Sequence, residues 1–174
     1  RLFTAAAGGV GLIACQWARA LGVTMIGTVG AEEKAALAKA HGCAYVINYN
    51  TENFVERVRE ITAGKGVPVV YDSIGKDTFK ASLDCLSPLG MMVSFGSASG
   101  PVPEFSLNEL ASRGSLFVTR PSLMSYTAQR ADLEQMAAQS FGMIESGKGR
   151  VDIRQRERLR EGARKNGDIE ERQE

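Results

Sequence analysis

The chain has 174 residues, 44% of them hydrophobic and 24% charged, which is the composition of one globular domain with a real core. Its formal net charge of +1 provides no overall field that would attract nucleic acid or an anionic membrane. No apolar run approaches the roughly 20 residues that a membrane-spanning helix needs.

Short apolar strands alternate with helical patterns along the first 150 residues, which is typical of a parallel α/β sheet. In chain order, the expected strands are 2–3, 23–29, 44–47, 67–72, 90–95 and 115–119. The expected helices are one with an apolar stripe over 10–21, one over 31–41, one capped by Thr51, one over 76–86, one opened by a capping box at Ser106–Glu109, and a long one with a stripe over 133–144.

The composition changes after residue 153. Residues 154–174 contain seven basic and six acidic side chains, with few apolar ones that would pack. We therefore expect a domain over 1–153, followed by a charged helix or frayed tail over 154–174. The chain opens inside an expected strand, so we also expect it to be a fragment that lacks an upstream domain.

Cysteine and histidine usage argues against a metal site. The three cysteines, Cys15, Cys43 and Cys85, are far apart in sequence, and His41 is the single histidine. No local set of four zinc ligands is available, so we expect no metal and free thiols in a reducing cytoplasm. His41 is expected to be exposed at a helix end, without a catalytic role.

A glycine-rich turn links the first expected strand to the first helix. The segment 5–11 reads Ala-Ala-Ala-Gly-Gly-Val-Gly, with Ala6 in the first glycine position of a Gly-x-Gly-x-x-Gly pattern. Gly8 permits a close approach of the backbone to a pyrophosphate, and Gly11 permits tight packing of helix on sheet. The helix N-terminus would offer free N–H groups to the phosphates, which predicts a dinucleotide site.

The second expected strand indicates NADP rather than NAD. It ends in Gly27-Thr28-Val29-Gly30, without the acidic residue that usually binds the ribose hydroxyls of NAD. Lys34 follows one helical turn later and is within reach of a 2′-phosphate, while Tyr49 follows the third strand. Glu32 and Glu33 stand in the first turn of the helix, where they favour its dipole.

These segments, together with further motifs, make the sequence resemble one known family. The further motifs are Gln16-Trp17-Ala18, Val46-Ile47-Asn48-Tyr49, Val70-Tyr71-Asp72-Ser73-Ile74-Gly75, Ser82-Leu83-Asp84-Cys85-Leu86, Val93-Ser94-Phe95-Gly96 and residues 114–123. Over residues 2–153 the chain is similar to the quinone oxidoreductase (zeta-crystallin-like) branch of the medium-chain dehydrogenase/reductase superfamily. Thr4 departs from the pattern, since the family commonly has histidine there.

The resemblance implies a Rossmann-type, doubly wound sheet of six parallel strands. It also implies an NADPH-dependent, metal-free enzyme that reduces quinones or related electrophilic carbonyl compounds. The cofactor-binding residues that it implies, together with those of the glycine turn, are Gly8, Gly9, Val10, Gly11, Gly30, Lys34, Tyr49, Ser73, Phe95, Gly96, Ser97, Pro121, Ser122, Leu123 and Arg172. Of these, Ser73 would lie near the adenosine half. The nicotinamide would be bordered by Phe95, Gly96 and Ser97 and by the turn Pro121-Ser122-Leu123. No catalytic side chain is expected, because the cofactor carries the hydride chemistry.

The resemblance further implies a homodimer that pairs the segment Leu116–Thr119 of two subunits. Without an upstream substrate domain, we expect this chain to bind NADPH weakly and to lack turnover. Two alternatives stay open: another zinc-free reductase of the superfamily, such as an enoyl or alkenal reductase, and a non-enzymatic dinucleotide- or RNA-binding module. The near-neutral charge disfavours the RNA-binding alternative.

Overall fold

The computed structural model of the chain describes residues 1–153, which form one parallel sheet between two layers of helices. The strand order is β3-β2-β1-β4-β5-β6, and all five pairings are parallel. This confirms the predicted fold class. The strands are β1 (Leu2–Phe3), β2 (Ile26–Val29), β3 (Tyr45–Asn48), β4 (Val67–Asp72), β5 (Leu86–Ser94) and β6 (Phe117–Thr119).

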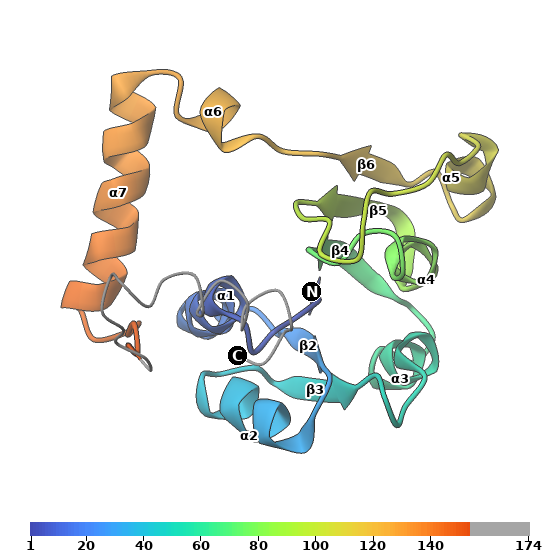
Figure 1. The fold of residues 1–174 in the computed structure, drawn as a ribbon, viewed down its shortest axis with the longest axis horizontal. Helices are drawn as coiled ribbons and strands as arrows, with labels where there is room; N and C mark the ends of the chain where they lie inside the picture. The colour runs from blue at the N-terminus through green and yellow to red at the C-terminus, as the bar shows by residue number, and fades with distance from the viewer. Residues whose placement is uncertain (154–174) are drawn as a thin grey trace, which may run out of the picture.

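Helices cover both faces of the sheet (Figure 1), as right-handed crossovers between parallel strands require. Helices α1 and α2 lie on one face, and α3, α4 and α5 lie on the other. The helices are α1 (Gly9–Ala20), α2 (Glu32–Ala40), α3 (Phe54–Ile61), α4 (Phe79–Asp84), α5 (Asn108–Ser112), α6 (Leu123–Tyr126) and α7 (Arg130–Glu145).

Two apolar cores lie on opposite faces of the sheet, because successive side chains of a strand point in opposite directions. Leu2 belongs to the core that includes Val58 of α3 and Phe79 of α4. Its neighbour Phe3 belongs to the core that includes Cys15 of α1. The buried strands thus contribute to both cores, which explains their continuous apolar sequence.

Two predicted helix caps are wrong, and the helix expected over 76–86 is shorter, since α4 covers only Phe79–Asp84 and Leu86 already belongs to β5. Helix α3 is capped by Asn53 and not by Thr51, since the Asn53 Oδ1 accepts from the Val55 N–H at 3.0 Å and from the Glu56 N–H at 3.4 Å. The capping box at Ser106–Glu109 is not formed either, because α5 starts at Asn108 and the Glu109 carboxylate faces other partners.

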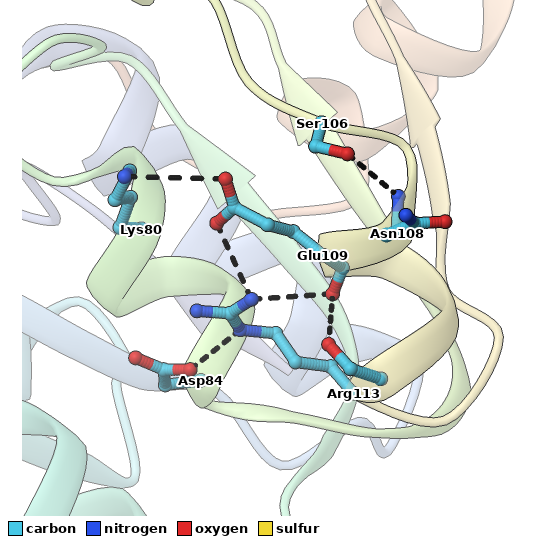
Figure 2. A network of polar contacts seen from close by, with 7 residues as sticks. Lys80, Asp84, Ser106, Asn108, Glu109 and Arg113 are labelled. Carbon is cyan, nitrogen blue, oxygen red and sulfur yellow. Dashed lines mark hydrogen bonds and ion pairs between the residues drawn. The ribbon is translucent and has the colours of Figure 1, made fainter.

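Glu109 instead joins α5 to α4 in a network of charged side chains (Figure 2). The Arg113 Nε lies 2.7 Å from the Asp84 Oδ1, and its Nη1 lies 3.4 Å from the Glu109 Oε2. Lys80 approaches the other Glu109 oxygen at 3.9 Å. The network fixes the segment that leads into β6 against the helix that follows β4.

Helix α7 stands apart from the sheet on the side of α1 (Figure 1). It has the predicted place in the chain, yet none of its residues is buried within the described part, and Phe141 and Ile144 of its apolar stripe are exposed. The chain returns to the domain after α7 through two hydrogen bonds between Gln16 and the backbone of Arg150, at 3.0 and 2.8 Å.

His41 takes part in the same return of the chain. Its Nε2 lies 3.1 Å from the Asp152 Oδ2, and its Nδ1 lies 2.8 Å from the Leu37 carbonyl oxygen. The expectation of an exposed His41 is therefore wrong, since its exposed fraction is 3%. The expected tail over 154–174, including Arg172, lies outside the described residues. Within 1–153, no helix is long and apolar enough to cross a membrane.

Candidate functional site

The strand order predicts a ligand crevice at the carboxyl ends of β1 and β4, by the rule for open α/β folds. The chain runs outward from β1 to β2 and β3, then crosses back to β4 on the other side of β1. The connections that leave β1 and β4 therefore diverge to opposite faces of the sheet, which is where ligands bind in open α/β folds. Thr4 directly follows β1, and Ser73 directly follows β4.

The glycine turn lies between β1 and α1 and is tightly constrained. Ala5 adopts a left-handed conformation with φ of 54°, an uncommon state for a residue with a side chain that is often found at ligand sites. A Cβ at Gly11 would lie 2.5 Å from the Ala5 carbonyl oxygen and 2.7 Å from the Ala6 backbone. By contrast, a Cβ at Gly9 would meet nothing within 4 Å. The close packing that was predicted for Gly11 is confirmed.

The first turn of α1 is suited to an anion. Its N-cap, Gly8, provides no side-chain hydrogen bond, and the turn contains no acidic residue. The first N–H groups of a helix have no partner within the helix, and they carry its positive dipole end. Val10 on this turn is 63% exposed, so the turn is open to solvent. These amide groups are able to bind phosphate oxygens in the way that the sequence predicted.

A second part of the crevice lies at the carboxyl ends of β2 and β3. The Tyr49 ring lies over Gly30, because a Cβ at Gly30 would be only 2.5 Å from the Tyr49 hydroxyl. The Asn50 Nδ2 donates to the Gly30 carbonyl at 2.7 Å and ties the two strand ends together. The half-buried Lys34 follows on α2, and no hydrogen bond or ion pair of its ammonium group occurs within residues 1–153. The structure thus brings Gly30 and Tyr49 together, with Lys34 one helical turn further along.

The neighbouring carboxylate is already bound by the protein. The Glu32 Oε1 accepts from the Asn48 Nδ2 at 3.0 Å, at the carboxyl end of β3. Glu32 therefore has a structural role in joining α2 to β3, besides the interaction with the helix dipole that the sequence suggested.

The turns after β4 and β5 form a third part of the crevice. A Cβ at Gly96 would lie 2.4 Å from the Ser73 carbonyl oxygen, so the two strand ends touch. The Ala98 N–H donates to the Ser73 carbonyl at 3.1 Å. Ser73 and Gly96, which the sequence predicted for the two halves of a cofactor, are therefore neighbours. Phe95 packs inward beneath them, with its ring centroid 5.5 Å from that of Phe3.

Arg120 is a residue of this region that the sequence interpretation missed. Its Nη1 donates to the Ser94 carbonyl at 3.0 Å and to the Gly96 carbonyl at 2.8 Å, which joins the end of β6 to the end of β5. The turn Pro121–Leu123 follows directly, half-buried at its proline and exposed at Ser122 and Leu123. Gly96, Ser97 and Arg120 also line an apolar cavity of about 310 Å³ with Phe79, Pro101, Val102, Phe105 and Val118.

Asp72 organises the turn after β4 from a fully buried position. Its Oδ1 accepts from the N–H groups of Ile74 and Gly75, at 2.8 and 3.0 Å. Its Oδ2 accepts from the hydroxyls of Thr78 and Ser82, at 2.7 and 2.8 Å. All four donors belong to the protein, so Asp72 is a structural residue and leaves no oxygen for a ligand.

The three cysteines are buried, free thiols. A hydrogen bond between Cys15 and Cys43 raises the pKa of the Cys43 thiol and lowers the pKa of the Cys15 thiol. Burial is the main cause that raises the pKa of Cys85 to about 12. Within residues 1–153, no group of three or more His, Cys, Asp or Glu side chains is arranged to hold a metal ion.

Comparisons with known proteins agree with this geometry. Residues 9–140 match the sequence family described as zinc-binding dehydrogenase. A quinone oxidoreductase of Pseudomonas aeruginosa is 57% identical over 163 residues, which are 94% of this chain and 50% of that protein. A 2-haloacrylate reductase of Burkholderia sp is 52% identical over 147 residues, 84% of this chain and 44% of that protein.

The fold is likewise close to that of a solved structure. The crystal structure of Escherichia coli quinone oxidoreductase complexed with NADPH has a TM-score of 0.95 and 51% sequence identity, over 98% of this chain and 53% of that chain. The chain thus spans about half the length of the relatives that it matches.

Proposed function

This chain belongs to the zinc-binding dehydrogenase family, and on that premise we propose that it is the NADPH-binding part of a reductase for quinones or related electrophilic carbonyl compounds. Its similarity to quinone oxidoreductases, which the motifs predicted, is confirmed at 57% identity. The name of the family mentions zinc, but within residues 1–153 no group of three or more His, Cys, Asp or Glu side chains is arranged to hold a metal ion.

The uncapped first turn of α1 is the observation that carries the proposal. A helix N-terminus that has neither a side-chain cap nor an acidic residue leaves its N–H groups for a pyrophosphate. Open space above Gly9 gives the phosphates access, whereas Gly11 holds the helix against the β1 turn. The Escherichia coli quinone oxidoreductase, which is 51% identical to this chain, was crystallised in complex with NADPH.

The residues at the other strand ends would then hold the rest of the dinucleotide. Lys34 and Tyr49 would bind the 2′-phosphate and the adenosine, Ser73 would lie against the adenosine half, and Gly96 and Ser97 would border the nicotinamide. NADPH supplies a hydride when it is bound, and the protein orients it and keeps water away. The turn Pro121–Leu123 would border the nicotinamide as well. Arg120 holds this turn next to Gly96, because its Nη1 donates to the Gly96 carbonyl.

Titration of this chain with NADPH and with NADH, followed by nucleotide fluorescence, tests the proposal. We expect saturable binding of NADPH and at least tenfold weaker binding of NADH. Absence of NADPH binding would refute the proposal. An assay of quinone reduction by the same preparation tests the expectation that the chain by itself lacks turnover.

A reductase for activated alkenes is a second candidate, because a 2-haloacrylate reductase is 52% identical to this chain. The nucleotide-binding part is shared by both kinds of enzyme, so the choice depends on the acceptor. Assays of a quinone and of a 2-haloacrylate with the gene product that contains this chain discriminate the two. We propose the quinone because the relatives named for it reach the higher identity.

We also propose a homodimer through β6 and a cytoplasmic location. Strand β6 is an edge of the sheet within the described part, and Phe117 on it is 56% exposed. Such an edge invites pairing with a second chain. Three free thiols agree with a reducing compartment. Sedimentation of the wild type and of a Phe117→Lys variant tests the dimer, since a charged side chain on the exposed edge opposes pairing of two strands and should yield a monomer.

A further inference from the structure

Thr4 and Ser73 face each other where β1 and β4 end, at the switch point of the sheet. Thr4 is completely buried, and its N–H donates to the Tyr71 carbonyl at 2.9 Å. Its Oγ1 accepts from the Ser73 N–H at 2.9 Å and lies 3.3 Å from the Ser73 Oγ. One of the two hydroxyls therefore donates its proton to the other, and either oxygen is able to be the donor.

Burial decides which hydroxyl donates. If Ser73 donated to Thr4, the Thr4 proton would need another acceptor, and residues 1–153 provide none for it besides the Ser73 Oγ. A buried hydrogen-bond donor that lacks an acceptor destabilises the fold. Ser73 is half-buried at the crevice, so its own proton does not carry this penalty. Thr4 is therefore the donor, and Ser73 accepts.

This arrangement leaves the Ser73 hydroxyl with a proton for an acceptor outside the pair. The backbone of Ser73 is fixed as well, since its N–H is bound by Thr4 and its carbonyl accepts from the Ala98 N–H. Gly96 packs directly against it. The backbone of Ser73 is thus fixed, and its hydroxyl is set as a hydrogen-bond donor, before any ligand binds.

We propose that Thr4 is a positioning residue, which fixes the Ser73 hydroxyl as a hydrogen-bond donor to an oxygen of the bound dinucleotide. The inference rests on the proposed function and deepens it, because it gives the buried Thr4 a task in binding the dinucleotide. Thr4 itself is buried and does not touch the ligand.

Four variants test the inference by NADPH affinity, at a temperature where thermal unfolding shows each protein to be folded. Ser73→Ala removes the donor, and Thr4→Val removes the hydroxyl that orients it. Thr4→Ser keeps a hydroxyl at position 4. The fourth variant combines Ser73→Ala with Thr4→Val. We expect three- to tenfold weaker binding for each of the first two, the range for one hydrogen bond. Thr4→Ser should bind within twofold of the wild type.

The double variant separates positioning from general damage. If Thr4 acts mainly through the Ser73 hydroxyl, Thr4→Val weakens NADPH binding clearly less in the Ser73→Ala background than in the wild type, where only the contact with the backbone N–H of residue 73 is still lost. A double variant whose loss equals the product of the two single losses would overturn the positioning role. Unchanged affinity of Ser73→Ala beside a binding wild type would overturn the donor assignment while leaving the proposed function intact, and this holds even if Thr4→Val does not fold. A wild type that fails to bind NADPH would refute both.

Discussion

The side chain of Ala6 occupies the space that a side chain at position 27 would need. A Cβ at Gly27 on β2 would lie 2.5 Å from the Ala6 Cβ and 2.8 Å from the Cys43 Sγ. Ala6 stands in the first glycine position of the glycine turn, and it is completely buried. The alanine is tolerated there because the neighbouring strand has no side chain at the point of contact.

Replacement of Gly27 by alanine should therefore destabilise the fold. We expect Gly27→Ala to lower the free energy of unfolding by about 1–3 kcal/mol, the usual cost of overpacking. Adding Ala6→Gly should recover part of the loss, since the contact with Cys43 remains. Urea denaturation measures all three proteins. Gly142→Ala on α7 is the matched control, because its new Cβ meets nothing within 4 Å, and a neutral result for Gly27→Ala would contradict the steric explanation.

Gly9 and Gly11 should separate ligand binding from folding. At Gly11 a Cβ collides with backbone at 2.5–2.7 Å, so Gly11→Ala should lower the thermal unfolding midpoint clearly. At Gly9 the space is open, so Gly9→Ala should keep the midpoint within a few degrees. Its methyl group would nevertheless enter the proposed phosphate site and weaken NADPH binding at least tenfold. Normal NADPH affinity in Gly9→Ala would argue against the phosphate site.

Lys34 should determine the preference for the 2′-phosphate. Replacing Lys34 by alanine removes a cation that has no ion pair in the described part, so we expect about tenfold weaker binding of NADPH and unchanged binding of NADH. Lys39→Ala on the last turn of the same helix is the matched control, and its affinities should equal those of the wild type. An equal loss for both nucleotides would mean that Lys34 acts on the fold and not on the phosphate.

Ionisation of the Cys85 thiol should lower the free energy of unfolding at alkaline pH. Burial raises the pKa of its thiol from the ordinary value of 9.0 to about 12. A raised pKa means that the stabilisation is complete below the pKa of the unfolded state, near 9.0, and is lost as the pH rises toward 12. We expect the difference in free energy of unfolding between the wild type and Cys85→Ala to fall by about 1.4 kcal/mol per pH unit over this interval.

Chemical denaturation between pH 8 and pH 11 provides the measurement. Subtracting Cys85→Ala cancels the titration of tyrosines and lysines that both proteins share. A difference that stays constant over this range would show that the folded thiol titrates normally.

Much of the fold was predictable because it depends on local sequence patterns. The alternation of apolar strands and amphipathic helices identified the parallel sheet, and the glycine turn indicated the end at which we propose that the nucleotide binds. Helix α7 was placed correctly in the chain for the same reason. Its apolar stripe did not reveal what it packs against, since the described residues leave that face exposed.

The contacts that were missed join residues far apart in sequence. Thr4 and Ser73 are separated by 69 positions, Arg120 and Ser94 by 26, and His41 and Asp152 by 111. No periodicity links such pairs, and a buried threonine resembles any other strand-end residue until its partner is known. The predicted capping role of the Glu109 carboxylate was wrong for a related reason. The carboxylate binds Lys80 and Arg113 instead, and the sequence did not indicate that these side chains would be near it.

The four hydrogen bonds that converge on Asp72 have an evolutionary consequence. An asparagine at this position would turn an NH₂ group toward donors. An alanine would leave the Ser82 hydroxyl and two amides without an acceptor, and the Thr78 hydroxyl with only the Gly75 carbonyl at 3.5 Å. Change at position 72 is therefore tolerable only together with change at positions 78 and 82. Across homologues, an aspartate here should occur with two hydroxyl side chains, and lineages that lose one should lose the others, so the three positions should be inherited as a unit.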